Sequence, residues 1–243
     1  MRSVIDVGNS TISYANFVDG ELIDPKRIET SKIQSVEDVK DLINDLKVDE
    51  SVSFVVSCGV KRIRELLETY FDNENVNEFF ISGVNTFGAN INYETPETLG
   101  SDRVANTIAV ANLYDTPCCV IDCGTAINVD VIDETKTFIG GSIRPGLQTS
   151  IDALTTFAPS LPKVALTSSL NIVGKNTIQC IQSGVVNVAA LSIDAEINEL
   201  RNLYPNVKAI ITGGHADIIH PLLENDVILD IWLTLKGLGL AEI

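Results

Sequence analysis

The chain contains one short motif twice, with the two copies about half the chain apart. The first copy reads Val4-Ile5-Asp6-Val7-Gly8-Asn9-Ser10, and residues 120–126 repeat it as Val-Ile-Asp-Cys-Gly-Thr-Ala. In each copy an apolar run ends in Asp-x-Gly and a hydroxyl or amide residue, and a second apolar run follows. This pattern predicts a strand, a tight turn and a returning strand. Because each copy opens one half of the chain, it also predicts an internal duplication.

A turn of this kind suits a phosphate group. Glycine lets the backbone approach closely, and backbone N–H, hydroxyl and amide groups donate hydrogen bonds to phosphate oxygens. Asp6 and Asp122 would then hold cations. A single copy would be better explained as a common hairpin turn, since Asp-Gly and Gly-Asn are frequent in such turns. The repeat favours the phosphate-binding interpretation.

Two such turns facing each other across a cleft would hold a nucleoside triphosphate from both sides, as in actin-like ATPases and in sugar and acetate kinases. We therefore expect an α/β fold with two similar ribonuclease-H-like domains and an interdomain cleft. The expected domains are residues 1–113 and 114–243. A chain of 243 residues is long enough for two cores of that size.

The charge of the chain argues against polyanionic partners. It carries 17 basic and 33 acidic residues, a formal net charge of −16. Binding to nucleic acid or to an anionic membrane surface needs concentrated positive charge, so we expect neither partner. A small anion such as a nucleotide stays possible, because backbone amides and a metal ion neutralise it locally.

The cysteines and the hydropathy pattern indicate the cytoplasm. The five cysteines are odd in number, form no Cys-x-x-Cys, and lie in apolar contexts, so we expect buried thiols in a reducing compartment. No signal-peptide core follows Met1, and we expect no apolar run near the ~18 residues of a membrane span.

Strand and helix patterns alternate along the chain, which is typical of a largely parallel α/β sheet. Helices are predicted at residues 36–46, 61–71, 103–113, 147–157 and 176–203; strands at 52–56, 78–81 and 207–211; and loops at 82–100, 139–146 and 158–173.

Gly100-Ser101-Asp102-Arg103 stands at the predicted start of the helix that links the two halves. One interpretation is structural, since acidic residues favour the first turn of a helix. The other is functional: Asp102 accepts a proton from an acceptor hydroxyl, and Arg103 binds an anion. Phosphoryl transfer asks little of its base, so an ordinary aspartate within hydrogen-bond reach would serve. Both interpretations stay open on this segment alone.

Two glycine-rich segments are also candidates. Gly140-Gly141-Ser142-Ile143-Arg144-Pro145-Gly146 precedes a predicted helix and would form a tight connection or a backbone collar over a ligand. Thr212-Gly213-Gly214 ends a predicted strand in front of a helix, where nucleotides commonly approach in α/β folds. The P-loop, hydrolase-elbow and Rossmann glycine patterns are absent from the sequence.

In this order, the segments resemble the type III pantothenate kinases. The resemblance spans nearly the whole chain and rests on residues 6–10, 93–103 (Tyr-Glu-Thr-Pro-Glu-Thr-Leu-Gly-Ser-Asp-Arg), 122–126, 140–146, 177–184 and 212–214. It implies ATP-dependent phosphorylation of pantothenate to 4′-phosphopantothenate, the first step of coenzyme A synthesis, with Mg²⁺ and a monovalent cation, K⁺ or NH₄⁺. It also implies a homodimer.

The resemblance implies a role for each matching residue. Asp102 would be the general base, Asp6 would hold Mg²⁺ through the phosphates, and Asp122 would bind the monovalent cation. The ATP contacts would be Asp6, Val7, Gly8, Asn9, Ser10, Thr11, Ile12, Ser13 and Thr125. The pantothenate contacts would be Tyr93, Gly100, Ser101, Asp102 and Arg103, with Thr177 donated across the dimer interface.

This chain departs from the family pattern at two positions of the first turn. Many members carry Thr where Ser10 stands, and some carry Lys near position 13, where this chain has Ser13. Without that charge we expect weak ATP binding. Two alternatives stay open: a non-catalytic regulator on the same fold, and a kinase or phosphatase for another small alcohol.

Overall fold

Both copies of the repeated motif form the predicted strand, turn and returning strand. In the computed structural model, which describes residues 1–47, 52–167 and 171–243, β1 (Arg2–Val7) pairs antiparallel with β2 (Thr11–Val18). In the second copy β7 (Cys118–Cys123) pairs antiparallel with β8 (Ala126–Ile132). The predicted hairpins are confirmed.

The duplication extends to the whole sheets. The first sheet has the order β3-β2-β1-β4-β5, completed by β3 (Glu21–Glu29), β4 (Ser53–Cys58) and β5 (Glu78–Phe80). The second contains the order β9-β8-β7-β10-β11, completed by β9 (Thr137–Pro145), β10 (Lys208–Thr212) and β11 (Ile228–Leu229). In each, the motif strand is central and pairs parallel with the next strand, β4 or β10. The expected duplicated α/β fold is confirmed.

The chain divides into two units that are discontinuous in sequence. Unit 1 comprises Met1–Asp115, Lys136–Ile139 and Trp232–Ile243, and unit 2 comprises Thr116–Thr135 and Gly140–Ile231. Our predicted domains, 1–113 and 114–243, were continuous. The units differ from them because the start of β9 pairs with β6 (Asn90–Ile91) and because the C-terminal helix belongs to unit 1.

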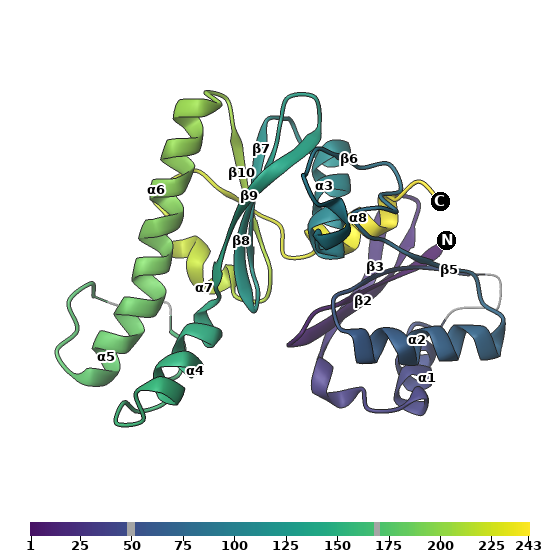
Figure 1. The fold of residues 1–243 in the computed structure, drawn as a ribbon, viewed down its shortest axis with the longest axis horizontal. Helices are drawn as coiled ribbons and strands as arrows, with labels where there is room; N and C mark the ends of the chain where they lie inside the picture. The colour runs from purple at the N-terminus through teal and green to yellow at the C-terminus, as the bar shows by residue number, and fades with distance from the viewer. Residues whose placement is uncertain (48–51, 168–170) are drawn as a thin grey trace. The chain divides into compact units, whose positions relative to one another are not determined.

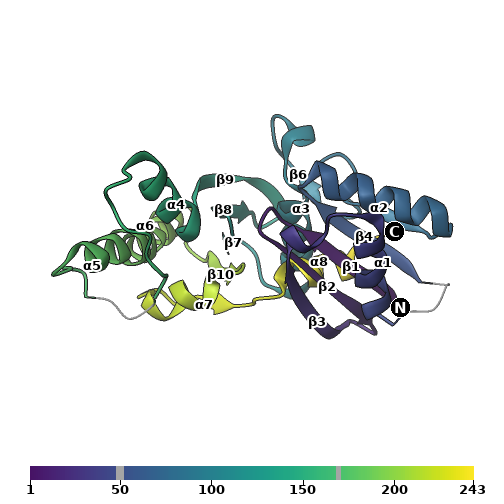
Figure 2. The same cartoon turned by 90° about the horizontal axis from the view of Figure 1, so that it is seen from below.

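In unit 1, helices cover both faces of the sheet (Figure 1). On one face, α1 (Val36–Asp45) and α2 (Lys61–Glu74) pack on aliphatic residues of β1 and β2. On the other, α3 (Ser101–Leu113) packs with α8 (Leu233–Leu240). Figure 2 shows β3, β2, β1 and β4 side by side between these layers. The start of α1 is set by a capping box, in which Ser35 and Asp38 satisfy each other's backbone N–H groups.

In unit 2, the long predicted helix forms as three consecutive segments. These are α5 (Thr177–Gln182), a π-helical turn (Ser183–Asn187) and α6 (Val188–Leu203) (Figure 1). This run has the length and hydropathy of a membrane span, contrary to our expectation for the chain. Its residues Val186, Ile193 and Ile197 are buried in the core of unit 2. That is the position of a core helix, which passes the same test of length and composition.

The remaining helices of unit 2 are short. α4 (Leu147–Phe157) matches its prediction, and α7 (Ala216–Ile219) follows β10. A short 3-10 turn follows at His220–Leu222, and unit 1 has two such turns, at Thr30–Lys32 and Pro96–Thr98.

Several expectations were wrong. The predicted loop at 139–146 lies largely within β9. At Gly141 this strand approaches the carbonyl of Val129 so closely that a side chain would collide with it. Glycine therefore allows this segment to run as a strand. Cys180 is exposed, although Cys118, Cys119 and Cys123 are buried as expected. The predicted loop at 82–100 contains β6 and a 3-10 turn. Residues 168–170 of the loop predicted at 158–173 lie outside the described residues.

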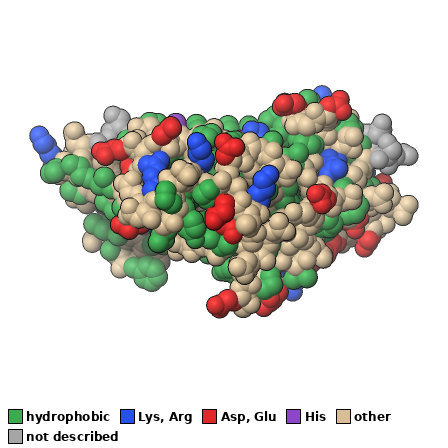
Figure 3. Space-filling model, turned by 90° about the horizontal axis from the view of Figure 1, so that it is seen from above, with side chains coloured by type: hydrophobic (Ala, Val, Ile, Leu, Met, Phe, Trp, Pro, Cys, Tyr) green, Lys and Arg blue, Asp and Glu red, His purple; other side chains and the backbone are tan. Residues whose placement is uncertain are grey.

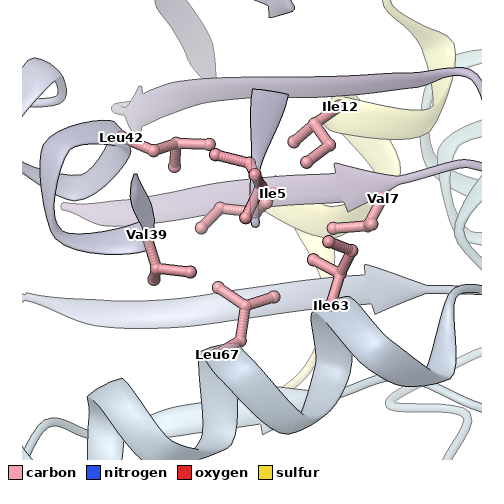
Figure 4. A pocket seen from close by; sticks show the side chains of 8 residues that line it. Ile5, Val7, Ile12, Val39, Leu42, Ile63 and Leu67 are labelled. Atoms are coloured by element: carbon pink, nitrogen blue, oxygen red, sulfur yellow. The ribbon is translucent and has the colours of Figure 1, made fainter. Parts of the chain in front are cut away.

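A small cavity lies within unit 1 between the sheet and helices α1 and α2 (Figure 4). It is lined only by aliphatic side chains: Ile5, Val7, Ile12, Ile33, Val39, Leu42, Ile63 and Leu67. A charged nucleotide would find no hydrogen-bond partner among these side chains. The cavity is therefore a packing gap of the core.

The contact between α3 and α8 depends on Gly237. A Cβ atom there would lie 1.8 Å from the carbonyl oxygen of Ala105. We expect Gly237→Ala to lower the free energy of unfolding by about 1–3 kcal/mol, because the helices must move apart. Gly59→Ala is the control, since its Cβ would meet Val7 at an ordinary 3.8 Å. Urea unfolding measures both, and equal midpoints would contradict this account of the packing.

Candidate active site

A row of polar side chains crosses the first sheet at the end of β1. The strand register places Asp6 opposite Ser13 of β2 and opposite Ser57 of β4, and it places Ser13 opposite Arg27 of β3. We call these four residues the polar row. Side chains alternate between the two faces of a strand, so the polar row shares a face with Val4 and the α3/α8 core. The cavity of Figure 4 is lined by residues of the opposite face.

The turn after β1 is closed by its own backbone and by Thr30. The N–H of Gly8 donates to the carbonyl of Thr11 at 2.9 Å. The Thr30 hydroxyl donates to the carbonyl of Gly8 at 2.7 Å. The backbone N–H of Thr30 donates to the carbonyl of Ser10 at 3.0 Å. Asn9 and Ser10 are exposed at the tip. The turn is thus held from outside while its tip stays accessible.

The predicted ATP contacts have different surroundings. The side chains of Val7 and Ile12 are buried in the core beneath α1 and α2, so only their backbone groups face the turn. Ser13 is buried and Thr11 is partly exposed. Among the predicted residues, Asn9 and Ser10 have the side chains best placed to donate to a phosphate.

Asp102 lies in the first turn of α3, as predicted. Its Oδ1 accepts a hydrogen bond from the N–H of Arg103 at 2.9 Å. A Cβ atom on Gly100 would come within 2.4 Å of that same oxygen, so a larger residue there would push the carboxylate out of this position. The absence of a side chain at Gly100 therefore leaves space for the Asp102 carboxylate.

Ser101 connects α3 to β4. Its Oγ lies 2.9 Å from the Oγ of Ser57 and accepts the N–H of Cys58 at 3.1 Å. Because the Ser57 hydroxyl donates to the Asp6 carboxylate, Ser101 is the donor to Ser57. Ser101 was predicted as a substrate contact; here its hydroxyl links the helix that carries Asp102 to the polar row.

The pKa values of Asp6 and Asp102 are both shifted towards the neutral form of the carboxyl group. Burial, followed by the charge of Asp102, raises the pKa of Asp6 to about 7, although Ser57 and Arg27 act in the opposite direction. Burial also raises the pKa of Asp102, against the N–H and charge of Arg103. Clusters of shifted carboxylates are typical of functional sites.

Arg103 is buried rather than exposed to solvent. Its guanidinium lies over the rings of Phe138 and Tyr93, with Cζ at 5.1 and 6.0 Å from their centroids. Tyr93 packs edge-on against Phe138, with centroids 5.6 Å apart. The structure thus brings together Tyr93, Gly100, Ser101, Asp102 and Arg103, five of the predicted pantothenate contacts.

In unit 2, glycines surround the second turn. The N–H of Gly124 donates to the carbonyl of Ala126 at 2.9 Å, so this turn is one residue tighter than the first. A Cβ on Gly213 would lie 2.5 Å from Oδ1 of Asp122, and one on Gly146 would lie 2.2 Å from the carbonyl of Gly124. Thr125 is exposed at the tip. The two predicted glycine-rich segments therefore both pack against the Asp122 turn.

Other candidates of unit 2 lie elsewhere in that unit. Arg144 pairs with Glu196 of α6 at 2.6 Å, and Ser142 donates to the same carboxylate. Thr177 is exposed at the start of α5, just after Asn176, whose side chain caps the helix. Among the described residues, no three His, Cys, Asp or Glu side chains gather as a ready metal site.

Sequence reasoning missed Arg27, Thr30 and Ser57. All three reach the first turn through strand register or from the end of β3, and none stands within a recognisable motif. A prediction of strand pairing could have found them.

The charged surface shows no concentrated basic area on the face in view. In Figure 3, Lys and Arg side chains are scattered among acidic and uncharged ones. Together with the net charge of −16, this gives a polyanion little to bind on that face.

Comparison with solved structures gives the fold class. A Campylobacter jejuni protein described as a Baf family transcriptional activator aligns with a TM-score of 0.60 and 20% identity, covering 97% of this chain and 94% of that one. The activator of 2-hydroxyisocaproyl-CoA dehydratase from Clostridium difficile, solved with ADPNP, aligns at 0.53 and 13%, covering 98% and 92%. The fold is that of actin-like ATPases and sugar kinases.

Sequence comparison then gives the family. The family model for type III pantothenate kinase matches residues 4–199. A type III pantothenate kinase from Sulfurihydrogenibium sp. (strain YO3AOP1) is 32% identical over 249 residues, covering 98% of both chains. The chain belongs to the type III pantothenate kinase family, whose members phosphorylate pantothenate with ATP for coenzyme A synthesis.

The raised pKa of Asp6 predicts a pH-dependent stability. The folded state holds this proton up to about pH 7, whereas an unfolded chain releases it near 3.8. Between these values the folded state binds more protons, so stability falls as the pH rises. We expect the melting temperature of Asp6→Asn to fall less than that of the unaltered protein as the pH rises from about 5 to 8. The melts are recorded without nucleotide or divalent metal.

The control is Asp72→Asn, at an exposed position of α2. It should keep the pH dependence of the unaltered protein in the same thermal melts. Parallel curves for the Asp6 variant and the unaltered protein would show that Asp6 has no such shift.

Proposed function

We propose that Asp102 is the general base of this pantothenate kinase. The pantothenate hydroxyl oxygen attacks the γ-phosphorus of ATP, the bond to the bridging oxygen breaks, ADP leaves, and the hydroxyl proton passes to the Asp102 carboxylate. The observation that carries the proposal is the placement of this carboxylate: it is enclosed at the start of α3, held by Gly100 and the Arg103 N–H, and beside Asp6. A raised pKa brings a carboxylate closer to the working pH of a base.

The residues of the first turn fit a Mg²⁺–ATP complex. Mg²⁺ is usually held by one or two carboxylates together with substrate phosphates. Asp6 supplies such a carboxylate, and its neighbour Asp102 makes added positive charge favourable there. When bound, the ion would neutralise developing charge on the phosphates. The exposed Asn9 and Ser10 and the N–H groups of the turn would bind phosphate oxygens in unit 1, and Thr125 would do so in unit 2.

The second turn fits a monovalent cation. The Asp122 carboxylate lies close to the backbone of Gly213 and Gly124. Oxygen ligands, carboxylate and carbonyl, are those that K⁺ takes in proteins. We assign this role to Asp122, with K⁺ or NH₄⁺ as the ion.

For pantothenate, the supported contacts are those around α3. Tyr93 and the Gly100–Arg103 segment lie together, and the buried Arg103 places a positive charge behind Tyr93. The carboxylate end of pantothenate would be the group attracted to that charge. Thr177, exposed at the start of α5, would come from the partner subunit of a homodimer.

The first experiment is a coupled ADP-release assay with pantothenate, ATP and Mg²⁺, in Na⁺ alone and then with K⁺ or NH₄⁺. We expect pantothenate-dependent release that rises with K⁺ or NH₄⁺. Asp102→Asn should lower kcat by about 100-fold or more, because the proton then has no acceptor. Asp72→Asn, on exposed α2, should leave kcat unchanged.

The contradicting outcomes are distinct. Near-normal turnover by the Asp102 variant would remove its role as base. A rate equal in Na⁺ and K⁺ would remove the role of Asp122. Absence of turnover from folded protein in every salt would favour a regulator on this fold, as the Campylobacter jejuni protein is described, or another small alcohol as the substrate.

The exposed face of the long helix supports a homodimer. Ile178, Val188 and Leu191 are about half-exposed along α5 and α6, and Phe157 is largely exposed on α4. An apolar stripe of this kind commonly marks a contact between chains. A cytoplasmic dimer fits a metabolic kinase with free thiols.

We expect Leu191→Glu to yield monomers in sedimentation velocity, because a charge on the stripe would be desolvated in a dimer. The control is Ile23→Glu on β3, where the exposed fraction is 51%, compared with 52% for Leu191. A dimer that survives the Leu191 substitution, or that Ile23→Glu dissociates equally, would place the interface elsewhere.

A further inference from the structure

Arg27 is the cationic end of the polar row. Its Nε donates to the Oγ of Ser13 at 3.1 Å, and Ser13 lies opposite Asp6 in the strand register. The charge of Arg27 acts on Asp6, whose pKa it lowers against the effect of burial. A positive charge therefore stands two strands from the aspartate that ends β1, on the same face of the sheet.

The side chain is oriented from two sides although it is exposed. Besides the bond to Ser13, the guanidinium lies over the ring of Trp232, with Cζ 5.0 Å from the ring centroid. A long exposed side chain normally loses rotamer freedom when it binds an anion. Here two contacts have already restricted the Arg27 side chain, so less rotamer freedom would be lost when it binds an anion.

The neighbouring turn lacks any other cation of its own. Residues 8–13 are Gly, Asn, Ser, Thr, Ile and Ser, so the first turn offers N–H, amide and hydroxyl donors only. The planar guanidinium carries five N–H donors in a fork that matches phosphate oxygens, and Ser13 accepts one of them. Phosphate is thus the anion to which both the turn and the arginine are suited.

We propose that Arg27 binds a phosphate oxygen of ATP and supplies the positive charge that Ser13 does not. The proposal rests on the proposed function, in which the first turn holds the nucleotide phosphates. It replaces the expectation of weak ATP binding from the sequence, because a cation from β3 reaches the position where other members carry lysine on β2.

The single tryptophan of the chain makes the proposal measurable without turnover. Trp232 lies beneath the Arg27 guanidinium, so occupation of Arg27 by phosphate should change its emission. We would titrate Mg²⁺–ATP, and separately inorganic tripolyphosphate, into the protein without pantothenate. Isothermal calorimetry on the same samples gives the affinity independently of the fluorophore.

We expect Arg27→Gln to weaken binding of both ligands about 10-fold, the size of one lost charge-assisted hydrogen bond. Arg27→Lys should recover part of the affinity, since it restores charge without the fork. The matched control is Arg64→Gln: Arg64 also lies over an aromatic ring, that of Phe80 at 4.4 Å, and is partly exposed on α2, where it pairs with Glu68. It should bind both ligands normally.

The outcomes separate this inference from the proposed function. Unchanged affinity in folded Arg27→Gln would overturn the inference, whether or not the unaltered protein phosphorylates pantothenate. Arg27-dependent ATP binding without pantothenate-dependent ADP release would support the inference and overturn the proposed function. An unaltered protein that binds neither ATP nor tripolyphosphate would overturn both.

Discussion

The carboxylate of Asp6 is held at the end of the central strand of unit 1, where burial works against its charge. The negative charge of this carboxylate is stabilised by groups from two other strands: the Ser57 hydroxyl of β4 and the Arg27 charge of β3. Because those groups belong to neighbouring strands, the sheet must have the order β3-β2-β1-β4 for them to meet. The strand order is thus a condition for placing charge at this point.

The two halves have the same strand arrangement around the aspartate of the motif but differ in one of its neighbours. Both end the motif strand in aspartate and place a hydroxyl residue beside it on the parallel strand, Ser57 opposite Asp6 and Thr212 opposite Asp122. On the antiparallel side the partners differ: Ser13, which Arg27 contacts, and Asn128. The first half therefore has a cation beside its turn, whereas the second has glycine backbone close to its carboxylate. This division suits one turn to phosphate and the other to a bound cation.

Much of this could be read from local sequence patterns, and the rest depends on contacts between distant segments. The helices α1, α2 and α4 have clear periodic stripes, and the duplicated motif revealed the hairpins. β3 was missed because its side chains are mostly exposed and Pro25 interrupts it. Asp102 was found because it stands in a motif. Arg27 and Ser57 were missed because only strand register brings them to Asp6, and a single sequence does not state its register.

Two hydroxyl groups connect the Asp6 carboxylate to the start of α3, where Asp102 lies. The N–H of Cys58 donates to Ser101, Ser101 to Ser57, and Ser57 to Asp6, while Asp102 follows Ser101 directly in α3. The charge of Asp102 raises the pKa of Asp6, so the two carboxylates oppose each other's ionisation. Positive charge at the first turn relieves that opposition, whether from Arg27 or from a cation that arrives with the nucleotide. In the proposed function Asp102 must be ionised to accept a proton, and compensation of its neighbour's charge favours that ionised form. In the proposed function, nucleotide binding is therefore coupled by electrostatics to the ionisation of Asp102, through residues of one sheet and one helix terminus.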